Sequence, residues 1–354
     1  MSHFCLLSRP EEYAAESWDL VADAEARAYW LDHFASHFDA TLQHALAQYG
    51  RPAGKRIDAA RERFAAVIEK LRQAPDSLPD GKLSVMRLCR LREKALRDHD
   101  LPDPFGHIKK RENASAVEMY PDVVQKLHSM PPEERWLHVI QGVFAGNIFD
   151  LGSAATMHLA GEATDFVTTA EELKPRPWLV DDFDTLAEGL LAAPPMPWTK
   201  AVVFADNAGC DFVLGMMPMI REMALEGTTV VLAANEQPSL NDITADEAVD
   251  VIERLAALDP DLDALIVGGM LEVVSSGNDI PLIDFSEVSD ELNAASGDAD
   301  LVVVEGMGRA IESNFDTEFK VSALRLALLK DEEVARRVGG NLYDAVCAYT
   351  AASA

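Results

Sequence analysis

The chain lacks the features that mark several common protein classes. No apolar run approaches the roughly 20 residues that a transmembrane helix needs. Residues 1–16 lack the order of charged and apolar segments that defines a signal peptide, so we expect no secretory leader. The four cysteines have no C-x-x-C spacing, which indicates neither a zinc site nor a disulfide framework. A reducing cytoplasm is the simplest location.

Basic residues are scarce in this sequence. The 354 residues include 31 Lys+Arg against 60 Asp+Glu, which gives a formal net charge of −29. Such a field repels nucleic acid and anionic membrane surfaces, so we expect neither as a partner. The same field opposes a phosphorylated substrate unless a metal ion and local cations offset it. Solubility or adaptation to salt is the plainer explanation for most of the surface carboxylates.

Three motifs of nucleotide or ester chemistry are also missing. The sequence contains neither G-x-G-x-x-G nor G-x-x-x-x-G-K-[ST], and Gly306-Met307-Gly308 is only a fragment of either. There is no G-x-S-x-G elbow, which removes the usual α/β-hydrolase mechanism. A dinucleotide-dependent oxidoreductase is therefore disfavoured.

The sequence divides into two regions that differ in their predicted secondary structure. In residues 1–195, apolar positions recur at three- and four-residue spacing, which predicts a mainly helical N-terminal domain. A proline-rich stretch, residues 174–200, marks the boundary. Residues 196–354 alternate strand, turn and helix, which predicts an α/β domain with a mostly parallel sheet and helices on both faces. Its expected strands are residues 201–205, 228–233, 265–267, 272–274, 301–304 and 342–347, with a helix at 319–329.

Polar side chains follow four of the predicted strands directly. These residues are Asp206 with Asn207, Asn235, Ser275, and Glu305 with Arg309. Because the carboxyl ends of parallel strands share one edge of a sheet, we expect the four loops to converge there. Carboxylate and amide oxygens suit a divalent cation, and Arg309 suits a phosphate group. Taken alone, Asp206 and Asn207 are also ordinary turn or helix-capping residues.

Several motifs, in this order, resemble the damage-control metal-dependent phosphatases, long called domain of unknown function 89. The likeness is greatest to the branch that includes the C-terminal domain of pantothenate kinase 4 and stand-alone plant and microbial proteins. It runs from about residue 100 to the end and is thinner before that. The motifs are Asp103-Pro104-Phe105 to Asn113, Gly146-Asn147-Ile148-Phe149-Asp150-Leu151-Gly152, Asp206-Asn207-Ala208-Gly209, Asn241-Asp242-Ile243-Thr244 and Glu305-Gly306-Met307-Gly308-Arg309-Ala310.

The resemblance implies a helical domain beside a Rossmann-like, three-layer α/β domain. It also implies a divalent metal, Mn²⁺, Co²⁺, Ni²⁺ or Mg²⁺, held at the positions of Asp206, Asn207 and Asp242. From the residues alone, Asp242 reads as a helix start. Members of the family hydrolyse phosphate monoesters such as sugar phosphates and phosphopantetheine-type metabolites, so we expect a small phosphorylated metabolite as substrate.

These expectations combine into a hypothesis of metal-assisted phosphomonoester hydrolysis. Asp206 and Asp242 would serve catalysis through the metal, and Asp150 or Glu305 would position the attacking water. Whether an aspartate attacks instead stays open. The expected phosphate-binding residues are Asn147, Arg309, Asn235, Ser275 and Lys109. Helix-end chemistry for Asn147 and Asp150, and a solvated helix start for Lys109, are the plainer interpretations.

A second hypothesis uses the same residues without turnover. The protein would then be a metal- or metabolite-binding regulatory module. The fold alone does not separate the two hypotheses.

Overall fold

A mixed sheet forms the centre of the computed structural model, which describes residues 1–16, 18–79, 82–148, 173–191 and 196–352. Within these residues the sheet has seven strands in the order β1-β7-β6-β5-β2-β3-β4. Neighbouring strands run parallel except β6 and β7, which are antiparallel. The strands are β1 Val180–Asp181, β2 Lys200–Phe204, β3 Thr229–Ala234, β4 Leu271–Ser275, β5 Leu301–Glu305, β6 Ser322–Leu328 and β7 Ala345–Thr350.

Helices surround the sheet, and their ends carry the expected capping residues. Asp23 accepts a hydrogen bond from the N–H of Ala26 at the start of α1, and Thr244 and Glu247 form a capping box on α9. None of the helices in the described residues combines the length and hydrophobicity that crossing a bilayer requires. The α-helices are α1 Ala24–Tyr49, α2 Gly54–Gln73, α3 Val85–Arg97, α4 Gly106–His128, α5 Pro132–Ile148, α7 Phe183–Leu190, α8 Met217–Leu225, α9 Ala245–Ala256, α10 Pro260–Val267, α11 Asp290–Ser296 and α12 Glu332–Arg337.

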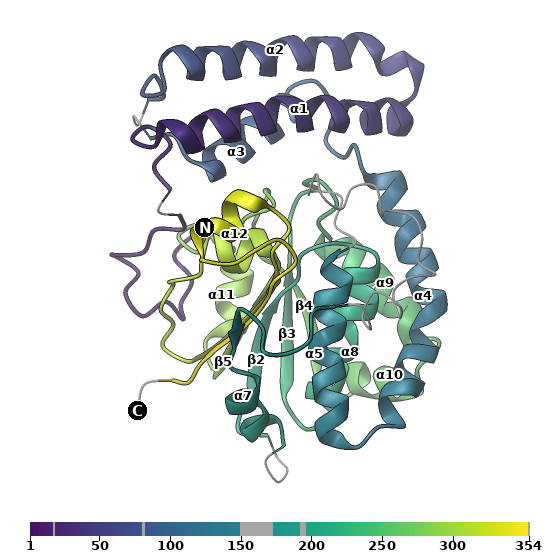
Figure 1. The fold of residues 1–354 in the computed structure, drawn as a ribbon. Helices are drawn as coiled ribbons and strands as arrows, with labels where there is room; N and C mark the ends of the chain where they lie inside the picture. The colour runs from purple at the N-terminus through teal and green to yellow at the C-terminus, as the bar shows by residue number, and fades with distance from the viewer. Residues whose placement is uncertain (17, 80–81, 149–172, 192–195, 353–354) are drawn as a thin grey trace.

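Two hydrophobic clusters cover the two faces of the sheet. Alternate residues of each strand point to opposite faces, so Val203 joins one cluster while Val202 and Phe204 join the other. Helices α4, α5 and α7 to α10 pack on the Val203 face, and α11 and α12 pack on the Phe204 face. Figure 1 shows α1, α2 and α3 as a further layer across one end of the sheet. The predicted α/β class with a mostly parallel sheet is confirmed.

Two local predictions are wrong. Residues 319–329, predicted as a helix, contain strand β6, in which every residue is buried. Its leucines and alanines favour helices on their own, but a strand buried on both faces shows no alternation, and pairing with β5 and β7 decides the structure. Residues 265–267, predicted as a strand, form the end of α10. Here a short apolar run was ambiguous between the two.

The division of the chain near residue 195 stays a prediction. Strand β1 and helix α7 precede that point, yet β1 pairs with β7, and α7 contributes Phe183 and Leu186 to the core of the Val203 face. At the N-terminus, Phe4 stacks on Phe285 and contacts Phe204 of β2 edge-on. Segments from both ends of the chain therefore share the core of one sheet.

Candidate metal and phosphate site

Arg309 joins the loops that follow strands β2, β3 and β5. Its Nε donates to Asp206 Oδ1 at 2.8 Å, and its Nη2 donates to Asp242 Oδ2 at 2.8 Å and to Asn235 Oδ1 at 3.2 Å. Its Nη1 donates to the carbonyl of Ala205. The guanidinium is fully buried. The loops therefore converge at the carboxyl edge of the sheet, as the strand ends predicted.

The three predicted metal ligands lie together on this edge. Asn207 and Asp242 form an isolated antiparallel bridge, and the N–H of Ile243 donates to the carbonyl of Asp206 at 3.0 Å. All three ligand side chains are buried and line the same pocket. The backbone thus fixes their relative positions, although their role as ligands stays a prediction.

A second group of carboxylates shares Asp206 with the predicted ligands and adds Asp211 and Glu305. The sequence analysis gave Asp211 no role. Oxygen atoms of Asp206, Asp211 and Glu305 lie within 4.8 Å of one another, and all three residues are buried. Asn147 contacts all three, because its Nδ2 donates to Glu305 Oε1 at 2.8 Å, to Asp211 Oδ2 at 3.0 Å and, more weakly, to Asp206 Oδ2 at 3.5 Å. Lys330 lies close enough that its positive charge partly offsets the rise in the pKa values of Asp211 and Glu305.

The electrostatics of this carboxylate group favour binding of a cation close to it. Burial, with the charge of Asp206, raises the pKa of Asp211 to about 7. Burial, with the charges of Asp211 and Asp206, raises the pKa of Glu305 well above its usual value. Within the described residues, one oxygen each of Asp211, Glu305 and Asn147 is buried without a hydrogen-bond partner. Buried polar atoms are normally satisfied, so this group offers hard oxygen donors as a second position for a divalent cation, next to the predicted ligands.

Asp211 could have been found from its spacing. It stands four residues after Asn207 and opens a π-helical turn, Asp211–Met216, that leads into α8. Its Oδ2 accepts hydrogen bonds from the backbone N–H of Asn207 at 3.3 Å and from the Nδ2 of Asn207 at 2.8 Å. This contact fixes the amide of Asn207. An aspartate at the start of a helix is common for capping reasons alone, which hid the signal.

At the start of α4, Lys109 and Asn113 are buried, whereas Lys110 and Arg111 are exposed to solvent. Asn113 Oδ1 accepts a hydrogen bond from the N–H of Gly209 at 2.6 Å. Lys109 is fully buried, and its Nζ lies 2.9 Å from Glu247 Oε1 and 3.4 Å from Asp103 Oδ2. The cation predicted to bind phosphate is therefore engaged by two carboxylates, and its phosphate role stays a prediction.

The remaining predicted residues do not all lie near the predicted metal ligands. Asn235 donates to Asp242 Oδ2 at 2.8 Å and so belongs to the site. Ser275 ends β4, and its hydroxyl accepts a hydrogen bond from the N–H of Gly277 at 3.2 Å. In the described part of the chain, Ser275 is not among the residues that line the pocket. Asp150 lies outside the described residues.

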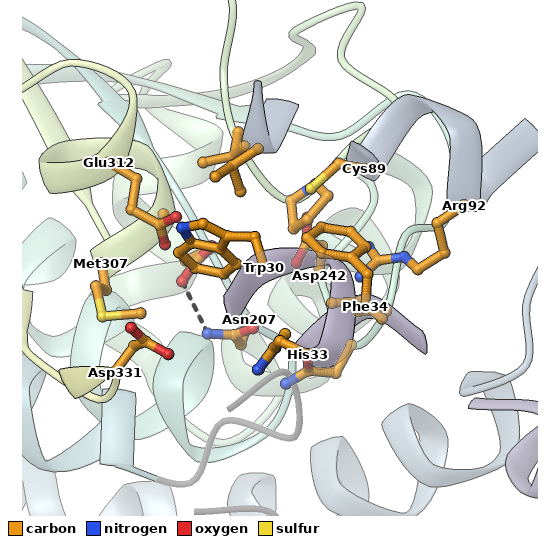
Figure 2. Close-up of a pocket in the computed structure, with 17 residues that line it drawn as sticks. Trp30, His33, Phe34, Cys89, Arg92, Asn207, Asp242, Met307, Glu312 and Asp331 are labelled. Carbon is orange, nitrogen blue, oxygen red and sulfur yellow. Dashed lines mark hydrogen bonds between the residues drawn. The ribbon is translucent and has the colours of Figure 1, made fainter. Parts of the chain in front are cut away.

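A pocket of about 100 Å³ opens above the predicted ligands, and the first 100 residues form its opposite wall. Sequence reasoning gave those residues no role at the site. Trp30, His33 and Phe34 share one face of α1, at a spacing that equally predicts a core-facing stripe. Figure 2 shows them beside Asn207 and Asp242, with Arg92 reaching in from α3. The space is that of about three water molecules or a group of phosphate size.

Buried carboxylates and amides gather at the carboxyl edge of the sheet, which is where α/β folds of this kind bind their ligands. Residues 35–346 match the family model described as the damage-control phosphatase ARMT1-like domain. The chain belongs to this family.

Relatives and a solved structure agree with this assignment. The chain is 40% identical to damage-control phosphatase At2g17340 of Arabidopsis thaliana, covering 90% of this chain and 86% of that protein. It is 38% identical to pantothenate kinase 2 of Arabidopsis thaliana, covering 98% of this chain and 41% of that protein, so it spans about two fifths of that relative. The 4'-phosphopantetheine phosphatase of Mus musculus is 35% identical over 79% of this chain and 34% of its own length. A DUF89 family protein from Pyrococcus horikoshii has the same fold, with a TM-score of 0.64, 16% identity, and coverage of 90% of this chain and 96% of that one.

Proposed function

We propose that this protein is a divalent-metal-dependent phosphatase that hydrolyses small phosphorylated metabolites as a form of damage control. The observation that carries the proposal is the buried cluster of Asp206, Asn207 and Asp242, linked through Arg309 and open to a pocket of phosphate size. Membership of the damage-control phosphatase family supports it.

The metal would be held by Asp206, Asn207 and Asp242, because these three line the pocket while Asp211 and Glu305 lie beneath it. A carboxylate, an amide and a second carboxylate provide the oxygen ligands that Mg²⁺ and Mn²⁺ prefer, and Co²⁺ and Ni²⁺ are the other candidates. When bound, such a cation acts as a Lewis acid on a phosphoryl oxygen and lowers the pKa of a water molecule.

The protein's own residues would keep this site rigid. Arg309 holds Asp206 and Asp242 at a fixed separation and offsets part of their charge. Asn207 is held in turn by Asp211, and Asn147 holds Asp211 and Glu305. Phosphoryl transfer requires positioning and charge neutralisation more than covalent chemistry, so prearranged donors of this kind are what the reaction needs.

The pocket also constrains the substrate. Its volume of about 100 Å³ accommodates a phosphoryl group and a few further atoms. The remainder of a metabolite would lie along the wall formed by Trp30, Phe34 and Leu240, which is mostly apolar. A 4'-phosphopantetheine-type compound, as the name of the mouse relative suggests, and a sugar phosphate are the two substrate types to compare.

The test is phosphate release from a panel of monoesters with each of Mn²⁺, Co²⁺, Ni²⁺ and Mg²⁺. The panel would contain 4'-phosphopantetheine, several sugar phosphates and p-nitrophenyl phosphate. We expect metal-dependent release by the wild type and none by Asp206→Ala, with the fold retained by circular dichroism. Asp261→Ala, a largely exposed aspartate on α10, is the control that should keep full activity.

Two outcomes would count against turnover. Equal activity of wild type and Asp206→Ala would remove the proposed metal site. A rise in melting temperature with Mn²⁺ and monoesters, but with no phosphate released under any metal, would instead favour a regulatory binding module.

A further inference from the structure

We propose that Arg92 binds the phosphoryl group of the substrate, an inference that rests on the proposed phosphatase function. Arg92 lies on α3, in the helical layer, and lines the pocket across from Asp206 and Asp242. Only 4% of its side chain is exposed. Among the described residues that line this pocket, it is the one arginine or lysine.

The cations predicted to bind phosphate are already engaged by carboxylates. Arg309 directs its Nε and both terminal nitrogens at Asp206, Asp242, Asn235 and the carbonyl of Ala205. Lys109 is enclosed by acidic side chains. Neither residue belongs to the described lining of the pocket. A phosphate dianion in the pocket therefore needs a donor from elsewhere.

Arg92 retains more hydrogen-bonding capacity than the other two cations. Its Nε and Nη2 donate to a single oxygen, Glu93 Oε1, at 3.0 and 2.8 Å. A guanidinium carries five N–H groups, so this pair leaves most of them for another acceptor. Within the described residues no hydrogen bond from Nη1 is present. The planar guanidinium also suits two oxygens of one phosphate group.

The side chain of Arg92 is held in place before any ligand arrives. Glu93 fixes one edge of the guanidinium, and the ring of Phe34 on α1 lies 5.6 Å from its central carbon. Figure 2 shows Arg92 pointing from α3 toward Phe34 and Asp242. Such anchoring lowers the entropy lost when a ligand is bound.

Charge in the pocket favours such a donor. The lining includes four acidic residues, which are Asp206, Asp242, Glu312 and Asp331. A divalent cation and Arg309 would offset the charges of Asp206 and Asp242, and an incoming phosphate would still meet the carboxylate of Asp331. Arg92 supplies a permanent positive charge on the wall that faces the predicted metal ligands.

A purely structural role, in which Arg92 only ties α3 to α1 through Phe34, makes a different prediction. Removing Arg92 would then reduce stability but leave phosphate affinity unchanged in the protein that remains folded. Because a single substitution would leave Glu93 buried without its partner, we choose the double variant Arg92→Gln with Glu93→Gln.

The experiment is a calorimetric titration of the Mn²⁺-loaded protein with inorganic phosphate. We expect the double variant to bind phosphate at least about tenfold more weakly than Glu93→Gln alone, as the loss of a charged hydrogen bond implies. Its Mn²⁺ affinity, measured separately, should stay within about twofold. Arg90→Gln, on the same helix but paired with Asp284 and Glu287, is the matched control that should bind phosphate normally.

Equal phosphate affinities of the double variant and Glu93→Gln would overturn the proposal, as would a Mn²⁺-loaded wild type that binds no phosphate. The titration decides the role of Arg92 even where the wild type releases no phosphate from monoesters, so the two proposals fail in distinguishable ways. Where hydrolysis is measured, we expect KM to rise more than kcat falls, and a structural role would not produce that pattern.

Discussion

Gly306 leaves no room for a side chain beside Asp206. A Cβ atom on Gly306 would lie 2.3 Å from Asp206 Oδ2, and the residue has φ of +98°, a conformation that residues with side chains rarely adopt. The turn after β5 therefore packs backbone directly against a predicted metal ligand.

We expect Gly306→Ala to displace Asp206 and to weaken Mn²⁺ binding by at least about tenfold, measured by titration of free Mn²⁺. The backbone strain should also cost about 1–3 kcal/mol of unfolding free energy. Gly339 separates the two effects, because its φ is +77° but a Cβ there would meet no atom within 4 Å. Gly339→Ala should therefore lose stability and keep Mn²⁺ binding, and equal Mn²⁺ affinity in both variants would contradict the expectation.

Isosteric substitutions should separate the predicted metal ligands from the carboxylates beneath them. We expect Asp206→Asn and Asp242→Asn to abolish measurable Mn²⁺ binding. Asp211→Asn and Glu305→Gln should weaken Mn²⁺ binding by about 10- to 100-fold without abolishing it, because a support of the ligands is lost rather than a ligand. Mn²⁺ titration of the four variants is the measurement. Loss of binding in Asp211→Asn and Glu305→Gln, with binding kept in Asp242→Asn, would place the metal in the lower carboxylate group.

Removing Arg309 should make stability depend on metal. Arg309→Met removes the cation that is paired with the buried Asp206 and Asp242, and breaking a buried ion pair in this way typically costs about 3–5 kcal/mol. Added Mn²⁺ should recover part of this loss, because it supplies positive charge to the same carboxylates. Urea unfolding with and without Mn²⁺ measures both effects. Arg61→Gln, which breaks an exposed ion pair with Asp39, should cost at most about 1 kcal/mol and show no extra response to Mn²⁺.

Glu312 should give the protein a distinct dependence on pH. Burial, with nearby Asp331 and Glu16, raises the pKa of Glu312 from 4.5 to about 8. The folded state therefore keeps a proton that the unfolded chain has released. The stability from this group is complete below pH 4.5 and is lost as pH rises toward 8.

We therefore expect Glu312→Gln to gain stability relative to the wild type as pH rises from about 5 to about 8, by a few kcal/mol at the upper end. Urea unfolding at both pH values measures the difference. Glu62→Gln, at an exposed position on α2, should show no such trend. A pH-independent difference for Glu312→Gln would refute the assignment.

The strand ends could be predicted because an apolar run that stops at polar residues has few interpretations. Asp206, Asn235 and Glu305 followed from that pattern, and parallel pairing brought them together. Asp242 came only from the family resemblance, since it lies beyond a loop after β3 and is joined to Asn207 by a backbone bridge that no local pattern reveals.

Other parts of the site have no local signature in the sequence. Trp30 and Phe34 have the spacing of core residues, and only the packing of α1 across the sheet edge makes them line a pocket. Strand β6 was predicted as a helix because its leucines and alanines favour helices. Its strand conformation depends on pairing with β5 and β7, which are separate segments before and after it in the chain. Arg309 lies beside the predicted metal ligands, but its pairing with Asp206 and Asp242 depends on three-dimensional contacts that no local pattern shows.

Two parts of the chain that are far apart in the sequence form the pocket together. Helices α1 and α3 form one wall, and the loops after β2 and β3 form the other, with the turn after β5 beside them. Changes in the helices can therefore reshape the surface offered to the organic part of a metabolite while the carboxylate cluster is inherited intact.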